Sequence, residues 1–317
     1  MTEIYELGIV GGGPAGAAAA IYAARKRIKT LLVVGDWGGQ SGVSSEIQNW
    51  IGTPTLSGTE LAANLRKHTE MYAGDWLTIA TPAWVSALLP HDDRVDITVK
   101  KGTEEAVYGL QALLIAAGAG RRKLEVPGAA AFDQKGLTYC ASCDGPLFAD
   151  QDVAVIGGGN AAFETALQLL AYCKSVTLLN RSDVVRADAI TIAAATAHPK
   201  MRIIKNAVPT SIEGAQFVTG LKYKDVKSGE ESLLLVTGIF VEIGLIPNTD
   251  WIGTALPMNE IKQLKVDPKT QRTAHPRIWA AGDCTDGLYH QNNIAAGDAV
   301  KALEDIYMFL RRSGTSA

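Results

Sequence analysis

Two segments of the chain share one pattern of hydrophobic and small residues. Tyr5–Ala24 and Asp152–Cys173 each place a short apolar run before a glycine turn and then a stretch of small and apolar residues. The first run predicts a buried strand and the second stretch predicts a helix. Each segment is followed by another apolar run, Lys29–Asp36 and Ser175–Arg181. Strand, turn, helix and strand form a βαβ unit, so the pattern predicts two Rossmann-like domains with parallel sheets.

The segments outside these two units predict further strands and one more helix. Between Ala73 and Gly120 the pattern first alternates and then becomes continuously apolar, which predicts antiparallel strands that lead into a buried strand. Gly238–Thr249 and Arg277–Cys284 predict further strands, and Asn293–Arg311 predicts an apolar helix. The C-terminal segments are too short for a core of their own, so we expect them to complete one of the two domains. Two short clusters are the best hinge candidates, Pro127-Gly128 and Pro247-Asn248.

Composition agrees with a folded protein of two domains. The chain has 317 residues, and a domain typically takes about 150. With 47% hydrophobic and 20% charged residues, disorder is excluded. A net charge of −3 gives no electrostatic footprint for nucleic acid or an anionic membrane, so we expect neither partner. The sequence contains no apolar run of the roughly 18 residues that span a membrane and no basic signal segment, so we expect a cytoplasmic location.

The first glycine turn, Gly11–Gly16, fits the pattern G-x-G-x-x-G between a strand and a helix. In this pattern Gly11 permits a tight turn, Gly13 lets the backbone approach a pyrophosphate, and Gly16 lets helix and strand pack closely. The helix N-terminus offers N–H groups and partial positive charge to the phosphates. Asp36 lies 20 residues beyond Gly16, where an acid can hold an adenosine ribose. The turn therefore predicts a bound dinucleotide.

The second glycine turn, Gly157–Ala162, reads GGGNAA and fits G-x-G-x-x-A in the same setting. It predicts a second nucleotide site. The alternative is a domain that keeps the fold and binds nothing.

The pair Cys140 and Cys143 carries redox chemistry in the motif CASCDG. Cysteines at i and i+3 in one helical turn can close a small, easily reduced disulfide, and a turn N-terminus favours the attacking thiolate. Asp144 is a candidate proton donor and acceptor for the dithiol. Half of a zinc site is the alternative, but the sequence has no second pair of ligands, so we expect no metal. We expect Cys173 and Cys284 to be buried small hydrophobes.

Taken in order, these motifs resemble the low-molecular-weight thioredoxin reductases over essentially the whole chain. Gly11–Gly16 resembles the FAD pyrophosphate loop, and CASCDG resembles the redox disulfide, differing from the usual CATCDG only at Ser142. His290 stands where the family usually has arginine. Four further segments resemble flavin-lining motifs: Gly38–Gln40, Asn49–Gly52, Ala280–Cys284 and His290–Ala299.

The resemblance implies an α/β protein with two Rossmann-like three-layer domains, the second inserted into the first. Residues 1–117 and 245–317 would form a discontinuous FAD-binding domain, and 118–244 a nucleotide-binding domain that carries the redox disulfide. It also implies a homodimer. The residues implied to bind FAD are Gly11, Gly13, Pro14, Ala15, Gly16, Asp36, Gly39, Gln40, Asn49, Gly282, Asp283, His290, Gln291 and Asn292.

The resemblance also assigns the catalytic roles. Cys143 would face the flavin, Cys140 would attack the disulfide of thioredoxin or a similar small protein, and Asp144 would handle the proton. The implied function is an FAD-linked disulfide oxidoreductase.

The departures from the family pattern are concentrated in the NADPH motifs. The usual GGGDSAxEEA is GGGNAAFETA here, and the usual HRRxxxR is NRSDVVR, with Asn180 for the histidine and Ser182 for an arginine. Leu245 replaces a further histidine. Losing one guanidinium removes a charge-assisted phosphate contact. The electron donor is therefore open between weakly bound NADPH, ferredoxin and another flavin, and the second pocket between NADPH, a second flavin and no ligand. The candidate residues of that pocket are Gly157, Gly159, Asn160, Ala161, Arg181 and Arg186.

Two other functions fit the same motifs. An FAD-dependent dithiol oxidase of this fold would pass electrons from small dithiols to oxygen. A non-catalytic redox sensor would bind FAD and a partner, but the complete set of Cys140, Cys143 and Asp144 argues against it. A fused peroxiredoxin reductase would need an additional N-terminal domain, whereas Met1 lies immediately before the first predicted strand.

Overall fold

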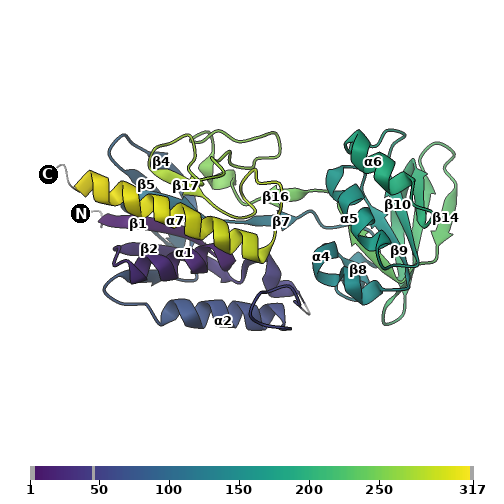
Figure 1. Cartoon of the computed structure of the whole chain (residues 1–317), viewed down its shortest axis with the longest axis horizontal. Coiled ribbons are helices and arrows are strands. Elements are labelled where there is room, and N and C mark those ends of the chain that lie inside the picture. Colours follow the sequence, from purple (N-terminus) through teal and green to yellow (C-terminus); the bar gives the residue numbers. More distant parts are fainter. Residues whose placement is uncertain (1–3, 45–46, 315–317) are drawn as a thin grey trace. The chain divides into compact units, whose positions relative to one another are not determined.

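The computed structural model describes residues 4–44 and 47–314. The chain forms two compact units, drawn in Figure 1. Unit 1 comprises Met1–Ser44, Trp50–Gly120 and Ile246–Ala317, and unit 2 comprises Ser45–Asn49 and Arg121–Leu245. The chain therefore passes between the units at 120/121 and 245/246, where the sequence places the division at 117/118 and 244/245. Unit 2 also takes in Ser45–Asn49, which the sequence-based division leaves in the first domain.

Unit 1 is built on a mixed sheet with strand order β3-β2-β1-β6-β5-β4, in which β17 also pairs with β6. β3, β2, β1, β6 and β17 are parallel to their neighbours, and β4, β5 and β6 form an antiparallel meander. The bounds are β1 Ile4–Gly12, β2 Thr30–Trp37, β3 Leu77–Ala80, β4 Trp84–Pro90, β5 Val95–Lys101, β6 Glu104–Ile115, β17 Ile278–Ala280, α1 Pro14–Arg25, α2 Gly58–Glu70, α7 Asn292–Gly314, η1 Gly39–Val43 and η3 Asp250–Ile252.

The two faces of this sheet bury separate hydrophobic clusters. Successive side chains of a strand point to opposite faces, so Leu32 and Val34 of β2 pack with α1 and α7, while Leu31 and Val33 pack with β4, β5 and the segment around Leu264. The alanines of α1 let this helix approach both the sheet and α7 closely.

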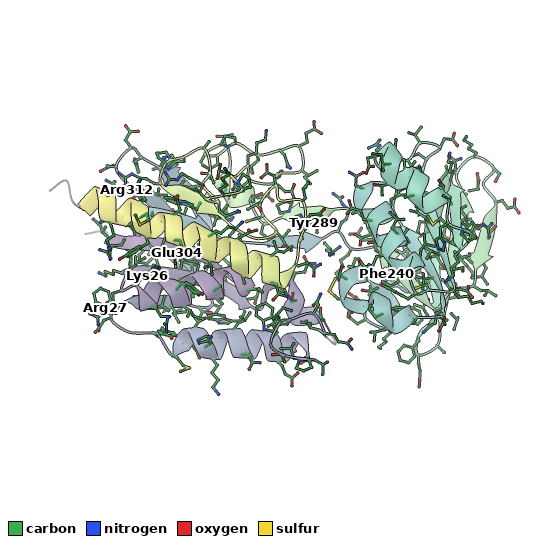
Figure 2. All side chains as sticks on the ribbon, viewed as in Figure 1. Lys26, Arg27, Phe240, Tyr289, Glu304 and Arg312 are labelled. Carbon is green, nitrogen blue, oxygen red and sulfur yellow. A yellow bond between two sulfur atoms is a disulfide. The ribbon has the colours of Figure 1, made fainter. Side chains whose placement is uncertain are left out.

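Figure 2 shows the side chains on this frame. Lys26, just after α1, pairs with Glu304 of α7 at 3.0 Å, at the outer edge of the helix pair. In unit 2, Phe240 lies fully buried in the sheet.

Unit 2 is a three-layer α/β unit. A parallel sheet with strand order β11-β10-β9-β15-β8 lies between helices and a small antiparallel sheet with order β12-β13-β14. Val153 and Val155 pack with α5 on one face, and Ala154 and Ile156 pack with β12 and β13 on the other. The bounds are β8 Leu137–Thr138, β9 Asp152–Ile156, β10 Ser175–Asn180, β11 Met201–Lys205, β12 Ala207–Gly214, β13 Val218–Asp225, β14 Glu231–Leu234, β15 Gly238–Val241, α3 Ala129–Phe132, α4 Ala141–Asp144, α5 Asn160–Leu170, α6 Ala189–Thr196 and η2 Gly145–Phe148.

The chain passages at 120/121 and 245/246 run through one ribbon. β7 (Ala119–Arg121) pairs with β16 (Leu245–Pro247), so the two passages are joined by backbone hydrogen bonds. Of the two hinge candidates, Pro247-Asn248 lies at the end of this ribbon. Pro127-Gly128 lies inside unit 2, where the Pro127 carbonyl accepts a hydrogen bond from the Ile212 N–H at 2.9 Å.

The repeated βαβ pattern predicts this α/β architecture correctly, and the element ends shift by a few residues. The apolar run Gly238–Thr249 is two strands, β15 and β16, because Gly244 between them adopts φ +112°. Within the described ranges, no helix combines the length and apolar character needed to cross a membrane.

Candidate functional site

The first glycine turn lines a cavity of about 560 Å³ in unit 1. The turn connects β1 to α1. The strand β1 lies between β2 on one side and β6 on the other, so the strand order changes direction at this turn. In open α/β sheets, ligands bind at such a switch point, outside the carboxyl ends of the strands. A volume of this size lies in the usual range of ligand pockets.

Glycine is required in this turn for two different reasons. Gly11 has φ +124°, which disfavours any other residue, and a Cβ there would overlap the carbonyl oxygen of Ala116 after β6. A Cβ at Gly16 would overlap the carbonyl oxygen of Gly11, so Gly16 permits the close packing of α1 on β1.

The backbone of this turn fits the pyrophosphate of a dinucleotide. Gly13 is the N-cap of α1, and no described side chain caps the helix or adds acidic charge to its first turn. The N–H groups of that turn are therefore left for a ligand. Gly13 and Gly39 lie opposite each other, since a Cβ on Gly39 would reach 3.5 Å from the Gly13 Cα. Because both residues lack side chains, the backbone on each side of the cradle is open to a ligand.

The C-terminal segment completes the cavity. Gly282 has φ +77°, and a Cβ there would meet Ala295 of α7 at 3.2 Å and Ala15 of α1 at 3.6 Å. Asp283 lines the cavity, and its carboxylate lies 3.5 Å from Nδ1 of His290. At the start of α7, the Oδ1 atom of Asn292 accepts a hydrogen bond from the Ser41 hydroxyl at 2.7 Å.

The structure brings together most residues that the sequence assigns to the flavin. The cavity is lined by Gly11, Gly13, Pro14, Ala15, Asp36, Gly39, Gln40, Gly282, Asp283 and Asn292. Gly16, Asn49, His290 and Gln291 are not among the lining residues. Asp36 is exposed at the carboxyl end of β2 and faces the cavity, as its spacing predicts.

Sequence reasoning missed part of the wall. Trp84, Ala116–Gly120, Asn248 and Trp251 also line the cavity. The sequence does carry a signal for Ala116–Gly120 as part of the cavity wall, because these small residues follow a predicted buried strand, which is β6, parallel to β1. Trp84 and Trp251 become neighbours of the glycine turn only through the tertiary fold.

The redox cysteines form a disulfide at the start of α4 in unit 2. Their Cα atoms are 5.3 Å apart, and both side chains are partly exposed. The Cys143 N–H donates a hydrogen bond to the Cys140 Sγ atom at 3.2 Å, which favours negative charge on that sulfur once the bond is reduced. The described residues contain no cluster of three or more histidine, cysteine or acidic side chains suited to a metal ion.

Asp144 directly follows Cys143 in the chain and is 7% exposed. The hydroxyl of Thr138 donates a hydrogen bond to its carboxylate and accepts one from the Cys140 N–H at 3.3 Å. Thr138 is 3% exposed and sits at the end of β8. The sequence does not single out Thr138, which joins the acid to the loop of the nucleophile.

The other two cysteines are buried, as the sequence predicts. Burial raises the pKa of Cys173 to about 11 and that of Cys284 to about 11. A raised pKa leaves little thiolate at neutral pH, which disfavours thiol exchange at both cysteines.

The second glycine turn repeats the geometry of the first in unit 2. β9 lies between β10 and β15, Gly157 has φ +147°, and Gly159 is the N-cap of α5. The loop that follows β10 makes two hydrogen bonds to this turn. The Arg186 N–H donates to the Gly158 carbonyl at 2.6 Å, and the Asp188 N–H donates to Oδ1 of Asn160 at 2.9 Å.

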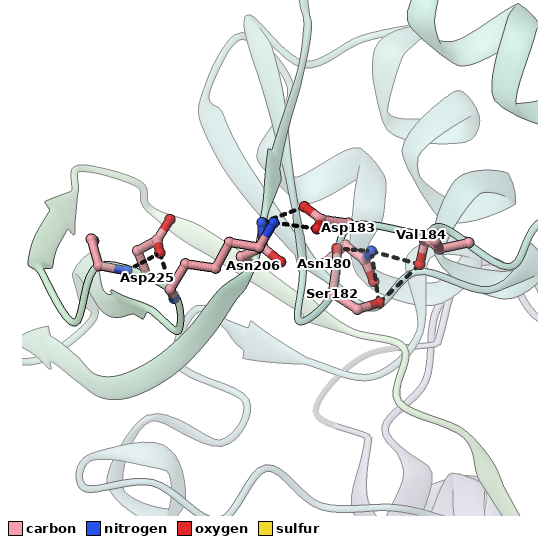
Figure 3. Close-up of polar contacts among 8 residues, drawn as sticks. Asn180, Ser182, Asp183, Val184, Asn206 and Asp225 are labelled. Carbon is pink, nitrogen blue, oxygen red and sulfur yellow. Dashed lines mark hydrogen bonds and ion pairs between the residues drawn. The ribbon is translucent and has the colours of Figure 1, made fainter.

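The residues that replace the family's phosphate-binding motif hold this loop closed (Figure 3). The Asn180 amide donates to the carbonyls of Ser182 and Val184 at 2.7 and 3.1 Å, and the Ser182 hydroxyl donates to the Val184 carbonyl at 2.9 Å. Asp183 pairs with Lys227 and accepts a hydrogen bond from Asn206 at 2.6 Å. The contacts with Lys227 and Asn206 hold the pKa of Asp183 below its usual range, so Asp183 is ionised and paired with Lys227.

Comparisons with known proteins agree with this geometry. The sequence profile of the family described as pyridine nucleotide-disulphide oxidoreductase matches residues 5–299. The chain is 37% identical over 311 residues to a protein named NADH dehydrogenase from Bacillus subtilis, and 38% identical over 311 residues to a subunit of alkyl hydroperoxide reductase from Staphylococcus aureus. Each alignment covers 98% of this chain and 60% of the relative, so the chain spans about three fifths of these relatives' length.

Two solved structures have a similar fold over 98% of this chain. Thioredoxin reductase from Streptococcus pyogenes is 31% identical, with a TM-score of 0.87, 98% of this chain covered and 100% of that one. Thioredoxin reductase from Giardia duodenalis is 29% identical, with a TM-score of 0.92 and the same coverage. The chain belongs to the pyridine nucleotide-disulphide oxidoreductase family, among its low-molecular-weight, thioredoxin reductase-like oxidoreductases.

Proposed function

We propose that this chain is an FAD-linked disulfide reductase that passes electrons through Cys140 and Cys143 to the disulfide of thioredoxin or a similar small protein. The observation that carries the proposal is the disulfide itself, partly exposed on α4 and backed by a buried acid. A structural disulfide would need neither the exposure nor the acid. Family membership and the cradle of Gly11, Gly13 and Gly39 support FAD as the cofactor of unit 1.

When bound, FAD supplies a carrier that takes up an electron pair from a donor and gives it on to the disulfide. The chain's own residues then perform the exchange. The Cys140 thiolate attacks one sulfur of the substrate disulfide, forming a mixed disulfide and releasing a substrate thiolate. The Cys143 thiolate attacks the Cys140 sulfur, which re-forms Cys140–Cys143 and releases the second substrate thiolate. Two electrons leave the dithiol, and Asp144 holds and delivers a proton to the leaving sulfur.

We propose that NADPH is an inefficient donor. The 2′-phosphate of NADPH is usually held by arginine. This loop keeps Arg181 and Arg186 but has Ser182 in place of one arginine of the family motif. The Ser182 hydroxyl donates to the Val184 carbonyl instead. A missing charge-assisted hydrogen bond costs about 1.5–3 kcal/mol, or roughly ten- to a hundredfold in affinity. Reduced ferredoxin or another flavin is the alternative donor that we propose. A homodimer is also part of the proposal and rests on the family resemblance, and we propose a cytoplasmic location as well.

The division between the cysteines is tested with single variants. The reduced protein is mixed with a thioredoxin whose exposed cysteine carries a thionitrobenzoate group. Cys143→Ser should release thionitrobenzoate and retain the thioredoxin as a stable adduct on Cys140, whereas Cys140→Ser should not. Ser142→Ala, which leaves both sulfurs in place, is the control and should turn over without accumulating adduct. Equal adduct with both cysteine variants, or with neither, would contradict the assignment.

A further inference from the structure

Trp84 is an exposed aromatic side chain in the wall of the unit 1 cavity. It is the first residue of β4 and is 53% exposed. The Ala83 N–H donates to the Val34 carbonyl at 2.8 Å, and Trp84 itself pairs with Lys100 of β5. The backbone at Trp84 is therefore fixed between β2 and β5, next to the carboxyl end of β2.

Gly35 makes room for this side chain. A Cβ on Gly35 would overlap the indole, because its nearest atoms are Nε1, Cε2 and Cδ1 of Trp84. Asp36, the residue after Gly35, lines the same cavity. The indole thus packs on the backbone beside the acid that is placed to hold a ribose.

The order of pyrophosphate, ribose and base in a dinucleotide indicates which of these groups lies beside the indole of Trp84. The pyrophosphate lies at the helix N-terminus and the ribose at the acid after the second strand, so the base lies beyond that acid. Aromatic side chains bind bases by stacking on their faces. We propose that Trp84 is the stacking platform for the adenine ring of the dinucleotide in unit 1, and that it makes this site select FAD over FMN.

Trp251 lines the cavity as well but is a weaker candidate. Its indole Nε1 donates to the Asn248 carbonyl at 2.9 Å, and the ring packs against the buried cluster on that face of the sheet. Trp84 has the larger exposed surface, which a stacked base would cover.

The proposal rests on the proposed FAD site, and the experiment separates the two. Flavin-free protein is titrated calorimetrically with FAD, FMN and ADP, for the unmodified chain and the variants Trp84→Ala and Trp84→Phe. Trp76→Ala is the control, because Trp76 is also an exposed tryptophan of unit 1, at 42%, and does not line the cavity.

Loss of one base–aromatic stack predicts about tenfold or more weaker binding of FAD and ADP to Trp84→Ala. FMN has no adenine, so its affinity should not change. Trp84→Phe should retain most of the FAD affinity, and Trp76→Ala all of it. Unchanged FAD affinity in Trp84→Ala, or equal losses for FAD and FMN, would overturn the role of Trp84. If the unmodified chain bound neither FAD nor ADP, the flavin site itself would be wrong, and this proposal with it.

Discussion

At the scale of single residues, the hydroxyl of Thr138 links Asp144 to the backbone of Cys140, and the proposed exchange makes that link testable. One hydroxyl donates to the carboxylate and accepts from the Cys140 N–H, so it fixes the acid relative to the nucleophile's loop. We describe Thr138 as a positioning residue, since it acts through Asp144.

Thr138→Val keeps the shape of the side chain and removes both hydrogen bonds. We expect the rate of thioredoxin reduction by the pre-reduced protein to fall about tenfold, in line with one lost hydrogen bond to a charged group. The pH profile of that rate should shift, because the carboxylate loses a donor that stabilises its charged form. Thr138→Ser should restore both rate and profile. An unchanged profile in Thr138→Val would contradict the positioning role.

The sequence predicts the residues whose chemistry depends on local spacing. Cys140, Cys143 and the glycines of both turns were identified because one helical turn or one βα turn places them together. Thr138 and Trp84 could not be found in this way. Thr138 meets Asp144 because β8 ends beside α4, and Trp84 meets Gly35 because β4 returns past β2.

At the scale of elements, the loop after β10 is hydrogen-bonded to the second glycine turn. Asn180 and Ser182 hold the loop through hydrogen bonds to its backbone, and Asp183 pairs with Lys227 (Figure 3). A buried strand end followed by a polar loop is all that the sequence pattern shows here. The closed conformation depends on side-chain contacts with the separate segments of Asn206 and Lys227, which no local pattern predicts.

Ser182→Arg restores one guanidinium to this loop, and we expect it to speed flavin reduction by NADPH. The gain should be roughly tenfold, the lower end of what the missing contact is worth. Adding Asn180→His, which releases the amide's hold on the loop, should increase the response further. Anaerobic stopped-flow absorbance measures the rate, with Ser228→Arg, a serine outside the loop, as the control. Fast reduction of the unmodified protein by micromolar NADPH would show that the closed loop is no obstacle.

At the scale of the whole molecule, the repeated βαβ pattern predicts two α/β units, and the family resemblance implies the return of the chain to the first of them. The ribbon of β7 and β16 carries the chain passages between the units at 120/121 and 245/246. It was less predictable from the sequence, because its strands are very short. Arg121 of this ribbon pairs with Glu242 at 3.2 Å, and Thr165 donates to the same carboxylate at 2.9 Å. Burial nevertheless raises the pKa of Glu242 above its ordinary 4.5.

This buried carboxyl group makes stability depend on pH. A carboxyl with a raised pKa in the folded state contributes stability below about pH 4.5, and that contribution is lost as pH rises through the folded-state value. Glu242→Gln removes the titration and leaves Arg121 paired with a neutral group. The stability of the variant relative to the unmodified protein should therefore rise as the pH increases above about 4.5. Thermal unfolding across this range measures it, with the exposed Glu230→Gln as the control; a constant or falling difference would contradict the account.

The central claim is that one chain binds a flavin and carries a disulfide, and that electrons pass from the flavin to the disulfide. Anaerobic titration of the purified protein with dithionite tests it most directly, followed by addition of oxidised thioredoxin. We predict a yellow protein with about one FAD per chain that takes up two electron pairs, one for the flavin and one for Cys140–Cys143. Oxidised thioredoxin should then draw electrons from it and restore the oxidised spectrum. A colourless protein that takes up no FAD, uptake of a single electron pair, or a reduced protein that thioredoxin leaves unchanged would contradict the account.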